Sequence, residues 1–368
     1  MPSDRALPSP PGKIAFFLTG HGFGHAVRNC ALMEALPAGV DIDIYTSIPE
    51  SFFRDELHRP FRVIPCEIDC GCLQADTVEV DVEGTLARYL ELDRERPDAI
   101  ARYAPMLRAG GADLVVADTP PLALPIAEAA GVPAWCVCNF TWLDIYAPYV
   151  AKHPRYLEMF RRMQADYALA DRHVRIHPAM AGAGAFAIEP AGIVCRPARR
   201  RRDAFAERFG LDPARKWALI YIGSFGLEGV DWARLADYPD WEFMGLYPLA
   251  GAPANYRFLK KDLSFRYADL NASCDLVLGK LGYGLVAECL AQAKPVIFLG
   301  RRDFDEFPVL KGVLEERGLG VEIPLDRFLS LDIGAELRAL AEAPHRPVKA
   351  TGVSDILRKM GYAGDNPL

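Results

Sequence analysis

The stretch KIAFFLTGHGFGHAVR, residues 13–28, decides the fold. Residues 13–18 form a continuous apolar run of strand length, and residues 26–36 have the spacing of apolar side chains expected in a helix. Three alternating glycines lie between them, and glycine permits a tight turn and the close approach of a ligand to a helix start. This order of strand, turn and helix predicts the first unit of a parallel sheet that is covered by helices on both faces.

The same order continues along both halves of the chain. In the first half we predict further strands at 41–45, 114–117 and 134–138, with helices at 86–107 and 122–130. In the second half we predict strands at 217–222, 241–245, 276–278 and 295–299, with helices at about 229–236, 283–293 and 307–317. Residues 179–197 are rich in Gly, Ala and Pro and separate the halves. We therefore predict an α/β fold of two Rossmann-like domains facing each other across a cleft, with the ligand at the carboxyl ends of the strands.

The composition limits the possible partners. The chain has 42 basic and 49 acidic side chains, and the net charge of −7 disfavours a general nucleic-acid binder. No apolar stretch approaches the roughly 20 residues that cross a bilayer, so we expect no stable membrane insertion. Residues 1–12 are polar and proline-rich without the apolar run of a signal peptide, so we expect a disordered leader. Nine cysteines form no paired C-x-x-C knuckles, which indicates reduced thiols in a cytoplasmic protein.

Two histidines, His21 and His25, lie in the first glycine-rich loop. The loop is not the dinucleotide fingerprint G-x-G-x-x-G, because that spacing needs a glycine at position 25, and the second strand lacks a terminal acidic residue. A neutral imidazole takes a proton from a hydroxyl near neutral pH when an acceptor orients its other nitrogen. Asp118, at the end of the third predicted strand, is the candidate acceptor. The spacing does not decide which histidine is the base, and a histidine that only caps the helix is the alternative.

A second glycine-rich loop lies in the second half of the chain. The stretch DLVLGKLGYG, residues 275–284, has the order strand, loop and helix, and backbone N–H groups at such a helix start bind anions. Lys280 adds a positive charge to this loop. Glu288 lies about one turn into the helix, where its carboxylate can accept the hydroxyls of a ribose; the alternative is a solvent-facing residue. Another small-residue turn, Gly223-Ser224, follows the strand predicted at 217–222.

Charged residues gather at two other places. Residues 300–307, GRRDFDEF, follow a predicted buried strand and form a polar cluster at the edge of the cleft. The D-x-D within them matches a metal-binding pattern of enzymes with another fold, but this tripeptide is common by chance, so we expect no metal and no cofactor. A basic run, Arg196 and Arg199–Arg202, is typical of a solvated linker and helix start, with a phosphate site as the alternative.

Several long motifs in one order resemble the GT-B superfamily of glycosyltransferases. The closest likeness within it is to the glycosyltransferase-like N-terminal region of L-arabinokinases and to free-standing bacterial relatives. The likeness covers residues 13 to about 323. The motifs are GHGFGHAVR (20–28), IDCGCLQADTVEVD (68–81), NFTWLDIY (139–146), GKLGYGLVAECLA (279–291) and RRDFDEFPVL (301–310). The likeness does not extend to the galactokinase-like half of the plant proteins, so it implies no sugar-kinase activity.

The resemblance implies transfer of a sugar from a nucleoside-diphosphate sugar, with a UDP-sugar favoured, to a small-molecule acceptor. It implies an acceptor domain at 13–190, a donor domain at 191–345 and a segment, 346–368, that packs back on the first domain. The displacement would be metal-independent and inverting, with His25, or its rival His21, as the base oriented by Asp118. The donor residues would be Gly223, Ser224, Lys280, Gly282, Tyr283, Gly284, Glu288, Asp305 and Glu306, and the acceptor residues Gly22, Phe23, Arg28, Asp69, Gln74, Asn139 and Trp142.

One departure from the relatives concerns the second glycine-rich loop. Leu285 and Ala287 stand where relatives often carry threonine and serine, and a lost hydroxyl beside the phosphates favours weaker donor binding or a contact shifted to Lys280 and backbone amides. Two other functions therefore stay open: a nucleotide-sugar 2-epimerase on the same fold, and a non-catalytic sensor that binds a nucleotide sugar. The sequence assigns no oligomeric state.

Overall fold

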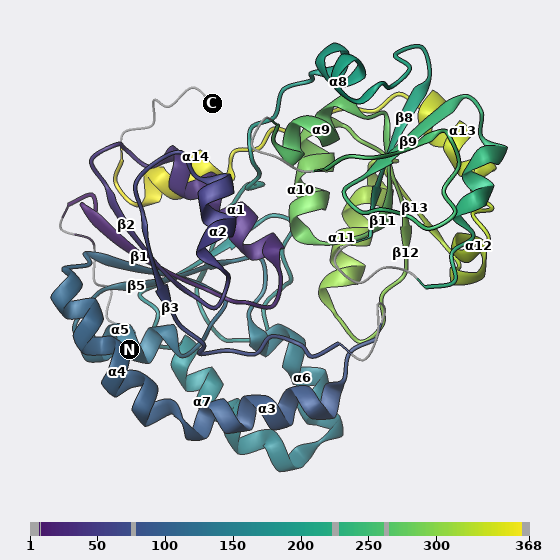
Figure 1. Ribbon diagram of the computed structural model, residues 1–368. Helices are drawn as coiled ribbons and strands as arrows, with labels where there is room; N and C mark the ends of the chain where they lie inside the picture. The colour runs from purple at the N-terminus through teal and green to yellow at the C-terminus, as the bar shows by residue number, and fades with distance from the viewer. Residues whose placement is uncertain (1–6, 8, 75–78, 223–227, 261–264, 363–368) are drawn as a thin grey trace.

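The computed structural model describes residues 7, 9–74, 79–222, 228–260 and 265–362, which form two α/β domains (Figure 1). The first domain contains a sheet of seven parallel strands in the order β3-β2-β1-β4-β5-β6-β7. The second contains a sheet of six parallel strands in the order β10-β9-β8-β11-β12-β13. The predicted architecture of two Rossmann-like parallel-sheet domains is therefore confirmed.

The first domain alternates strands and helices. Its strands are β1 (Lys13–Leu18), β2 (Asp41–Thr46), β3 (Arg62–Pro65), β4 (Leu114–Asp118), β5 (Ala134–Cys138), β6 (Arg172–Ile176) and β7 (Ile188–Ala191). Its helices are α1 (Phe23–Ala35), α2 (Glu50–Glu56), α3 (Val82–Arg94), α4 (Arg96–Gly110), α5 (Ala123–Ala130), α6 (Trp142–Lys152) and α7 (Leu157–Tyr167), with a short 3-10 helix η1 (Pro154–Tyr156).

The second domain repeats this pattern. Its strands are β8 (Lys216–Tyr221), β9 (Trp241–Gly245), β10 (Tyr256–Phe258), β11 (Leu276–Lys280), β12 (Val296–Leu299) and β13 (Gly320–Ile323). The helices are α8 (Arg202–Phe209), η2 (Trp232–Asp237, a 3-10 helix), α9 (Tyr267–Ser273), α10 (Tyr283–Gln292), α11 (Glu306–Glu316), α12 (Leu325–Leu329) and α13 (Gly334–Glu342), and the last helix, α14, is Gly352–Lys359. Within the described residues, no helix is both long enough and apolar enough to span a membrane.

The structure differs from the predicted elements in two ways. The helix predicted at 86–107 is two helices, α3 and α4, because the chain changes direction at Glu95 and Pro97 begins a new helix rather than interrupting one. The helix predicted at 229–236 is the short 3-10 helix η2. The strands β3, β7 and β10 lie at sheet edges, have three or four residues and contain exposed or partly exposed positions, so they lack the continuous apolar run by which central strands are recognised.

The two faces of the first sheet bury alternate residues of each strand. Ile14 and Phe16 of β1 point into the cluster that also contains the apolar faces of α1 and α14, whereas Ala15 and Phe17 point into the cluster beneath α3–α7. Figure 1 shows α1, α2 and α14 on one side of this sheet and α3–α7 on the other. All four side chains are fully buried, as the period of two along a strand in a covered sheet requires.

The first of these clusters continues into the second domain. Helix α1 packs against α10, and the cluster runs from Phe16 and Ala26 in the first domain to Val286 and Val277 in the second. The second face of the β8–β13 sheet has a separate cluster beneath α12, α13 and η2. The domains are therefore joined by a shared apolar core on the side where α1 meets α10.

The C-terminal helix lies on the first sheet, although it follows the second domain in sequence (Figure 1). Helix α14 packs against α1 and β7, and the backbone N–H of Gly192 donates to Asp355 Oδ2 at 3.0 Å. Nearby, the Tyr362 hydroxyl donates to the carbonyl oxygen of Pro11, and the N–H of Gly12 donates to Asp113 Oδ2 at 2.8 Å. The prediction of a disordered leader through residue 12 is therefore wrong for Pro11 and Gly12; residues 1–6 and 8 lie outside the described part of the chain.

Replacing Ile356 with alanine is expected to lower the free energy of unfolding by about 2–5 kcal/mol, because it opens a cavity in the core between α14 and the first domain. Chemical denaturation measures this change. Ser354→Ala, on the exposed side of the same helix, is the matched control, with an expected change within about 0.5 kcal/mol. Equal effects of the two substitutions would contradict the docking of α14 through this face.

Candidate active site

The candidate active site lies where the first two central strands end. Strands β1 and β4 are neighbours, and Leu18 at the end of β1 pairs with Asp118 at the end of β4. The glycine-rich loop after β1 leads directly into α1, whose N-cap is Gly22. This register brings the first turn of α1 over the end of β4, so that His25 meets Asp118 although 93 residues separate them.

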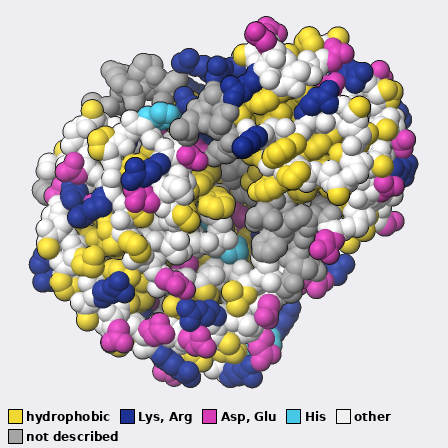
Figure 2. Space-filling model, in the orientation of Figure 1, with side chains coloured by type: hydrophobic (Ala, Val, Ile, Leu, Met, Phe, Trp, Pro, Cys, Tyr) yellow, Lys and Arg dark blue, Asp and Glu magenta, His cyan; other side chains and the backbone are white. Residues whose placement is uncertain are grey.

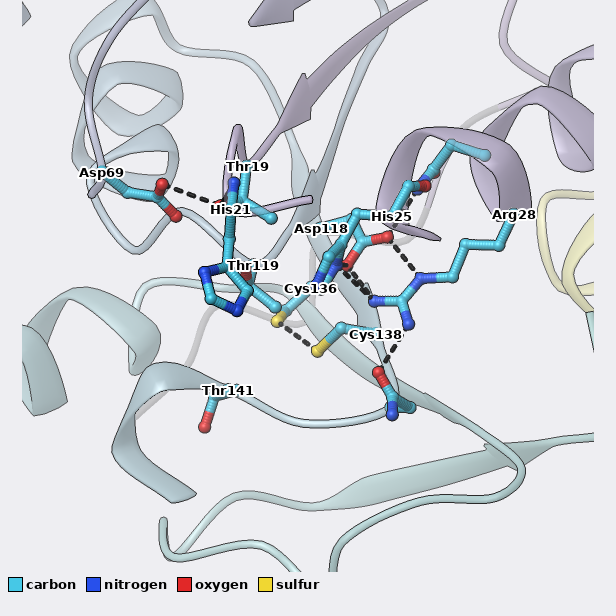
Figure 3. Close-up of polar contacts among 12 residues, drawn as sticks. Thr19, His21, His25, Arg28, Asp69, Asp118, Thr119, Cys136, Cys138 and Thr141 are labelled. Atoms are coloured by element: carbon cyan, nitrogen blue, oxygen red, sulfur yellow. Dashed lines mark hydrogen bonds and ion pairs between the residues drawn. The ribbon is translucent and has the colours of Figure 1, made fainter. Parts of the chain in front are cut away.

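His25 and Asp118 form a buried pair (Figure 3). The distance from His25 Nδ1 to Asp118 Oδ1 is 3.0 Å, and the two residues are 7% and 0% exposed. Arg28 Nη2 also lies 2.9 Å from Nδ1, but this guanidinium nitrogen already donates to Asp118, whereas the carboxylate can only accept. We therefore assign the proton to Nδ1, where it donates to the carboxylate. This tautomer leaves the lone pair of His25 on Nε2.

Arg28 and Asn29 complete the surroundings of the Asp118 carboxylate. Arg28 Nε donates to Oδ2 at 2.6 Å, Arg28 Nη2 donates to Oδ1, and the Asn29 amide also donates to Oδ2. Burial by itself raises the pKa of Asp118, but the charges and hydrogen bonds of Arg28 and His25 outweigh it and hold this pKa at about 2. Asp118 therefore stays ionised and acceptor-only at neutral pH.

His21 has a different environment from His25. Its Nδ1 accepts a hydrogen bond from the backbone N–H of Cys72 at 3.0 Å, and its ring stacks on Phe304. Gly71 permits this contact, because a Cβ at that position would lie 2.5 Å from the His21 ring and the backbone φ is +61°. Burial, and then the positive charge of Arg301, lower the pKa of His21, so the imidazole is neutral and carries its proton on Nε2. Figure 3 shows its ring apart from the cluster around Asp118.

Two predicted acceptor residues are structural instead. Trp142 is completely buried, and its indole Nε1 donates to Asp69 Oδ2 at 2.7 Å. The other oxygen of Asp69 accepts from the Thr19 hydroxyl at 2.8 Å (Figure 3). Both oxygens of Asp69 are thus used within the protein, and the pair ties the loop after β1 to the start of α6. The predicted contact of Trp142 with the acceptor does not fit this placement.

A chain of hydrogen bonds links the Asp118 cluster to the second domain. Arg28 Nη1 donates to Asn139 Oδ1 at 2.5 Å, and Asn139 Nδ2 donates to Glu306 Oε1 at 2.7 Å. Arg28 and Asn139 are 2% and 0% exposed, so their predicted contact with the acceptor does not fit this arrangement either. Glu306, at the start of α11, is thereby fixed against the first domain, whereas Asp305 before it is exposed.

The two glycine-rich loops approach each other. The N-caps of α1 and α10 are Gly22 and Gly282, and a Cβ on Gly284 would lie only 3.9 Å from the Cα of Gly24. Lys280 ends β11 beside this junction, close enough for its charge to lower the pKa of His21. Two positive helix ends and a lysine therefore converge where the resemblance places a diphosphate. Figure 2 shows a furrow between the two lobes on this side of the molecule.

The Glu288 carboxylate is buried and bound by another side chain, so in this conformation a ligand does not reach it. It is 1% exposed, and its Oε1 accepts from Arg196 Nε at 2.8 Å. Arg196 also donates through Nη1 to Glu56 Oε2 at 2.8 Å, so one guanidinium joins α10, the interdomain segment and α2. Burial raises the pKa of Glu288, and the Arg196 charge opposes that rise. The solvent-facing alternative for Glu288 and the solvated-linker interpretation of Arg196 are wrong, and a ribose reaches Glu288 only if Arg196 moves.

The remaining predicted residues are dispersed around this junction. Tyr283 is buried and uses its hydroxyl within the protein, donating to the His177 carbonyl oxygen at 3.0 Å and accepting from Val194 N–H at 3.1 Å. Phe23 is 54% exposed and stacks on Phe52. Gln74 is partly buried, and its amide atoms have no hydrogen-bond partner in the part of the chain that the structure describes. Gly223 and Ser224 lie outside the described residues.

Leu285 and Ala287, which stand where relatives often carry threonine and serine, occupy buried positions. The two side chains are 3% and 0% exposed and belong to the apolar core that α10 shares with the first domain. Sequence reasoning missed this role, and it also missed Asn29 and Arg196, because their partners lie 89 and 92 residues away. The one available signal was the i, i+3 and i, i+4 spacing of His25, Arg28 and Asn29, which places them on one face of α1.

Arg196→Met is expected to lower the free energy of unfolding by about 3–5 kcal/mol at pH 7, because it leaves the buried Glu288 carboxylate without its counter-charge. Arg199→Met, at an exposed position of the same basic run, is the matched control with an expected change below about 0.5 kcal/mol. Adding Glu288→Gln to Arg196→Met should restore part of the loss in the same denaturation experiment. A loss below about 1 kcal/mol in the single variant would argue against a buried ion pair.

The sequence comparison finds one region of a longer protein. The chain is 31% identical over 319 residues to L-arabinokinase of Arabidopsis thaliana, an alignment that covers 84% of this chain. The chain spans 30% of the length of that protein. No protein-family model matches the sequence.

The structure comparison finds glycosyltransferases at low sequence identity. A UDP-glucosyltransferase from Polygonum tinctorium matches with a TM-score of 0.62 at 13% identity, over 96% of this chain and 93% of the other. The glycotransferase of kitacinnamycin matches with a TM-score of 0.61 at 18% identity, over 96% and 94% of the two chains. The glycosyltransferase VinC, in complex with dTDP, matches with a TM-score of 0.60 at 12% identity, over 95% of both chains. The chain therefore has the GT-B fold of these glycosyltransferases, and over most of its length it is similar in sequence to part of L-arabinokinase.

Proposed function

We propose that the protein transfers a sugar from a nucleoside-diphosphate sugar, with UDP as the favoured nucleotide, to a small-molecule acceptor, in a metal-independent step that inverts the anomeric carbon. The observation that carries the proposal is the His25–Asp118 pair at the junction of the two glycine-rich loops. A base and an anion site are the two elements that this reaction requires, one for the acceptor proton and one for the leaving diphosphate.

His25 is the proposed base rather than His21. Its Nδ1–H is bound by Asp118, so Nε2 keeps a lone pair that can accept the proton of an attacking hydroxyl. The resulting imidazolium is stabilised by the Asp118 carboxylate, which Arg28 keeps ionised. In His21 the Nδ1 lone pair is taken by the Cys72 N–H, and Nε2 carries the proton. His21 is therefore a hydrogen-bond donor to substrate at most.

The proposed leaving-group site is the start of α10. As the acceptor oxygen bonds to the anomeric carbon, the bond from that carbon to the β-phosphate oxygen breaks and negative charge collects on the diphosphate. In this proposal, Lys280 at the end of β11, the N–H groups at Gly282–Gly284 and the dipole of α10 stabilise that charge. Asp305 and Glu306 are the proposed contacts for hydroxyls of the transferred sugar.

The names of the similar proteins support the same partners. VinC is in complex with dTDP, and the Polygonum protein is a UDP-glucosyltransferase that glucosylates indoxyl, a small molecule. These likenesses, at 12% and 13% identity, carry the fold alone, so the nucleotide and the acceptor of this chain are part of the proposal.

Lys280→Ala is expected to weaken UDP binding about tenfold to hundredfold, because it removes a charge-assisted contact with the diphosphate. Thermal stabilisation by UDP, dTDP, GDP and ADP, each without and with magnesium, measures it; a hundredfold excess of ligand over Kd stabilises the fold by about 2.7 kcal/mol. Lys216→Ala, at the opposite end of the same sheet, is the control and should bind like the wild type. If no nucleoside diphosphate stabilises the wild type, the donor site is wrongly assigned.

His25→Gln is expected to lower kcat for glycosyl transfer by about 10²–10⁴ while leaving UDP binding within twofold, because only the proton acceptor is lost. His21→Gln should lower kcat by less than tenfold. The measurement is UDP release from UDP-glucose with the acceptor found in a screen, with mass spectrometry of the products. Comparable losses in both variants would refute the choice of His25.

The two other functions give different results in this experiment. A 2-epimerase converts the donor without an acceptor and leaves its mass unchanged. A sensor binds the nucleotide sugar without turnover and is indifferent to His25→Gln.

A further inference from the structure

Arg301 is a cation of the interdomain junction without a counter-ion. It follows β12 and Gly300, and its guanidinium carbon lies 3.8 Å from the centre of the Phe304 ring. Among the described residues, its buried Nε has no hydrogen-bond partner and no carboxylate forms an ion pair with its guanidinium. Arg302 next to it is a useful contrast, because it is mostly exposed and pairs with Glu79 at 2.9 Å.

The surroundings of Arg301 come from both domains. Its charge acts on His21, Cys72 and Tyr149 of the first domain and is itself influenced by Glu306 of the second. The loop that carries it is fixed across the junction, because the Tyr149 hydroxyl donates to the carbonyl oxygen of Asp303. Burial lowers the pKa of Arg301 from its ordinary value, which reflects the cost of an unpaired charge away from water.

Two buried carboxylates of this region are already paired with other arginines. Asp118 is held by Arg28, and Glu288 is held by Arg196. Glu306 accepts from Asn139 and makes no ion pair with Arg301 within 4 Å. A partly buried guanidinium with an unused Nε–H and no carboxylate partner among the described residues is costly unless something binds it, and in a substrate cleft that partner is a ligand anion.

We propose that Arg301 is a specificity-determining residue that binds a carboxylate of the substrate. This inference rests on the proposed function and adds to it the chemical class of one substrate. Arginine binds carboxylates in a planar, two-point geometry, and the Phe304 ring holds the guanidinium from one face while leaving its edge available.

The charge count favours a carboxylate over a phosphate. His21, on whose pKa the charge of Arg301 acts, is neutral because that pKa is lowered, and Lys280 belongs to the proposed diphosphate site. One unpaired positive charge matches a single negative charge, whereas a phosphate dianion needs a second cation. The carboxylate belongs either to the donor sugar, as in a uronic acid, or to the acceptor, since Arg301 lies between groups of both domains.

The test uses matched pairs of neutral and acidic probes with the full-length protein. In the donor arm, calorimetry compares UDP-glucuronate with UDP-glucose. In the acceptor arm, it compares glucuronate with glucose in the presence of saturating UDP. We expect the acidic member of one pair to bind about tenfold to hundredfold more tightly than its neutral counterpart, the range expected for charge-assisted hydrogen bonds. The pair that shows the preference identifies the source of the carboxylate.

Two variants decide whether Arg301 causes that preference. Arg301→Met keeps an apolar stem against Phe304 and should reduce the preference to less than twofold, whereas Arg302→Met should leave it unchanged. The inference is overturned if neither pair shows a preference in the wild type, or if the preference survives in Arg301→Met. UDP alone is the internal reference: its binding to the wild type tests the proposed donor site separately, and its failure to bind removes the proposed function together with this inference.

Discussion

The candidate site depends on one buried negative charge. Asp118 is completely buried at the end of a central strand, where an unpaired carboxylate would cost several kcal/mol. Three side chains from one face of α1, His25, Arg28 and Asn29, satisfy it. The rotation of α1 about its own axis is therefore fixed by the need to bind the Asp118 carboxylate. In that orientation His25 donates from Nδ1, which determines the tautomer of its imidazole. Fold stability and the orientation of the proposed base have the same physical origin.

This constraint extends across the domain junction. Arg28 donates a hydrogen bond to Asn139, and Asn139 donates to Glu306 at the start of α11. The same chain of hydrogen bonds therefore connects Asp118 to the second domain. The apolar core between α1 and α10 fixes the two glycine-rich loops against each other at the same time. A ligand that separates the loops must also disturb this chain, which couples occupancy of the proposed donor site to the position of the groups around Asp118.

The sequence predicted the architecture and a contact of Asp118 with one of the two histidines of the loop, because both follow from rules about strands, but it did not decide between His21 and His25. Central parallel strands are continuous apolar runs, and residues that end adjacent strands meet at one edge of the sheet. It did not predict that Arg28, Asn139 and Trp142 are internal. The sequence around a polar or aromatic residue beside a cleft is the same whether its side chain contacts a ligand or another part of the protein. The hydrogen-bond partners of these three residues lie 73 to 167 residues away in the chain, so the local sequence does not reveal them. Arg196 was misread for the same reason, since a basic run does not reveal the buried carboxylates that one of its members binds.

The hydrogen-bond and ion-pair partners of each side chain also explain why residues of the same type have different roles at the domain junction. The two histidines are distinguished by what binds Nδ1, a carboxylate for His25 and a backbone N–H for His21, and this alone decides which Nε2 keeps a lone pair. The arginines are distinguished in the same way. Arg28 and Arg196 are neutralised by buried carboxylates and serve the architecture, whereas Arg301 meets only an aromatic face among the described residues. A charge that the protein leaves unpaired at a domain junction is available to a ligand, and this is the physical difference between a structural and a recognising arginine.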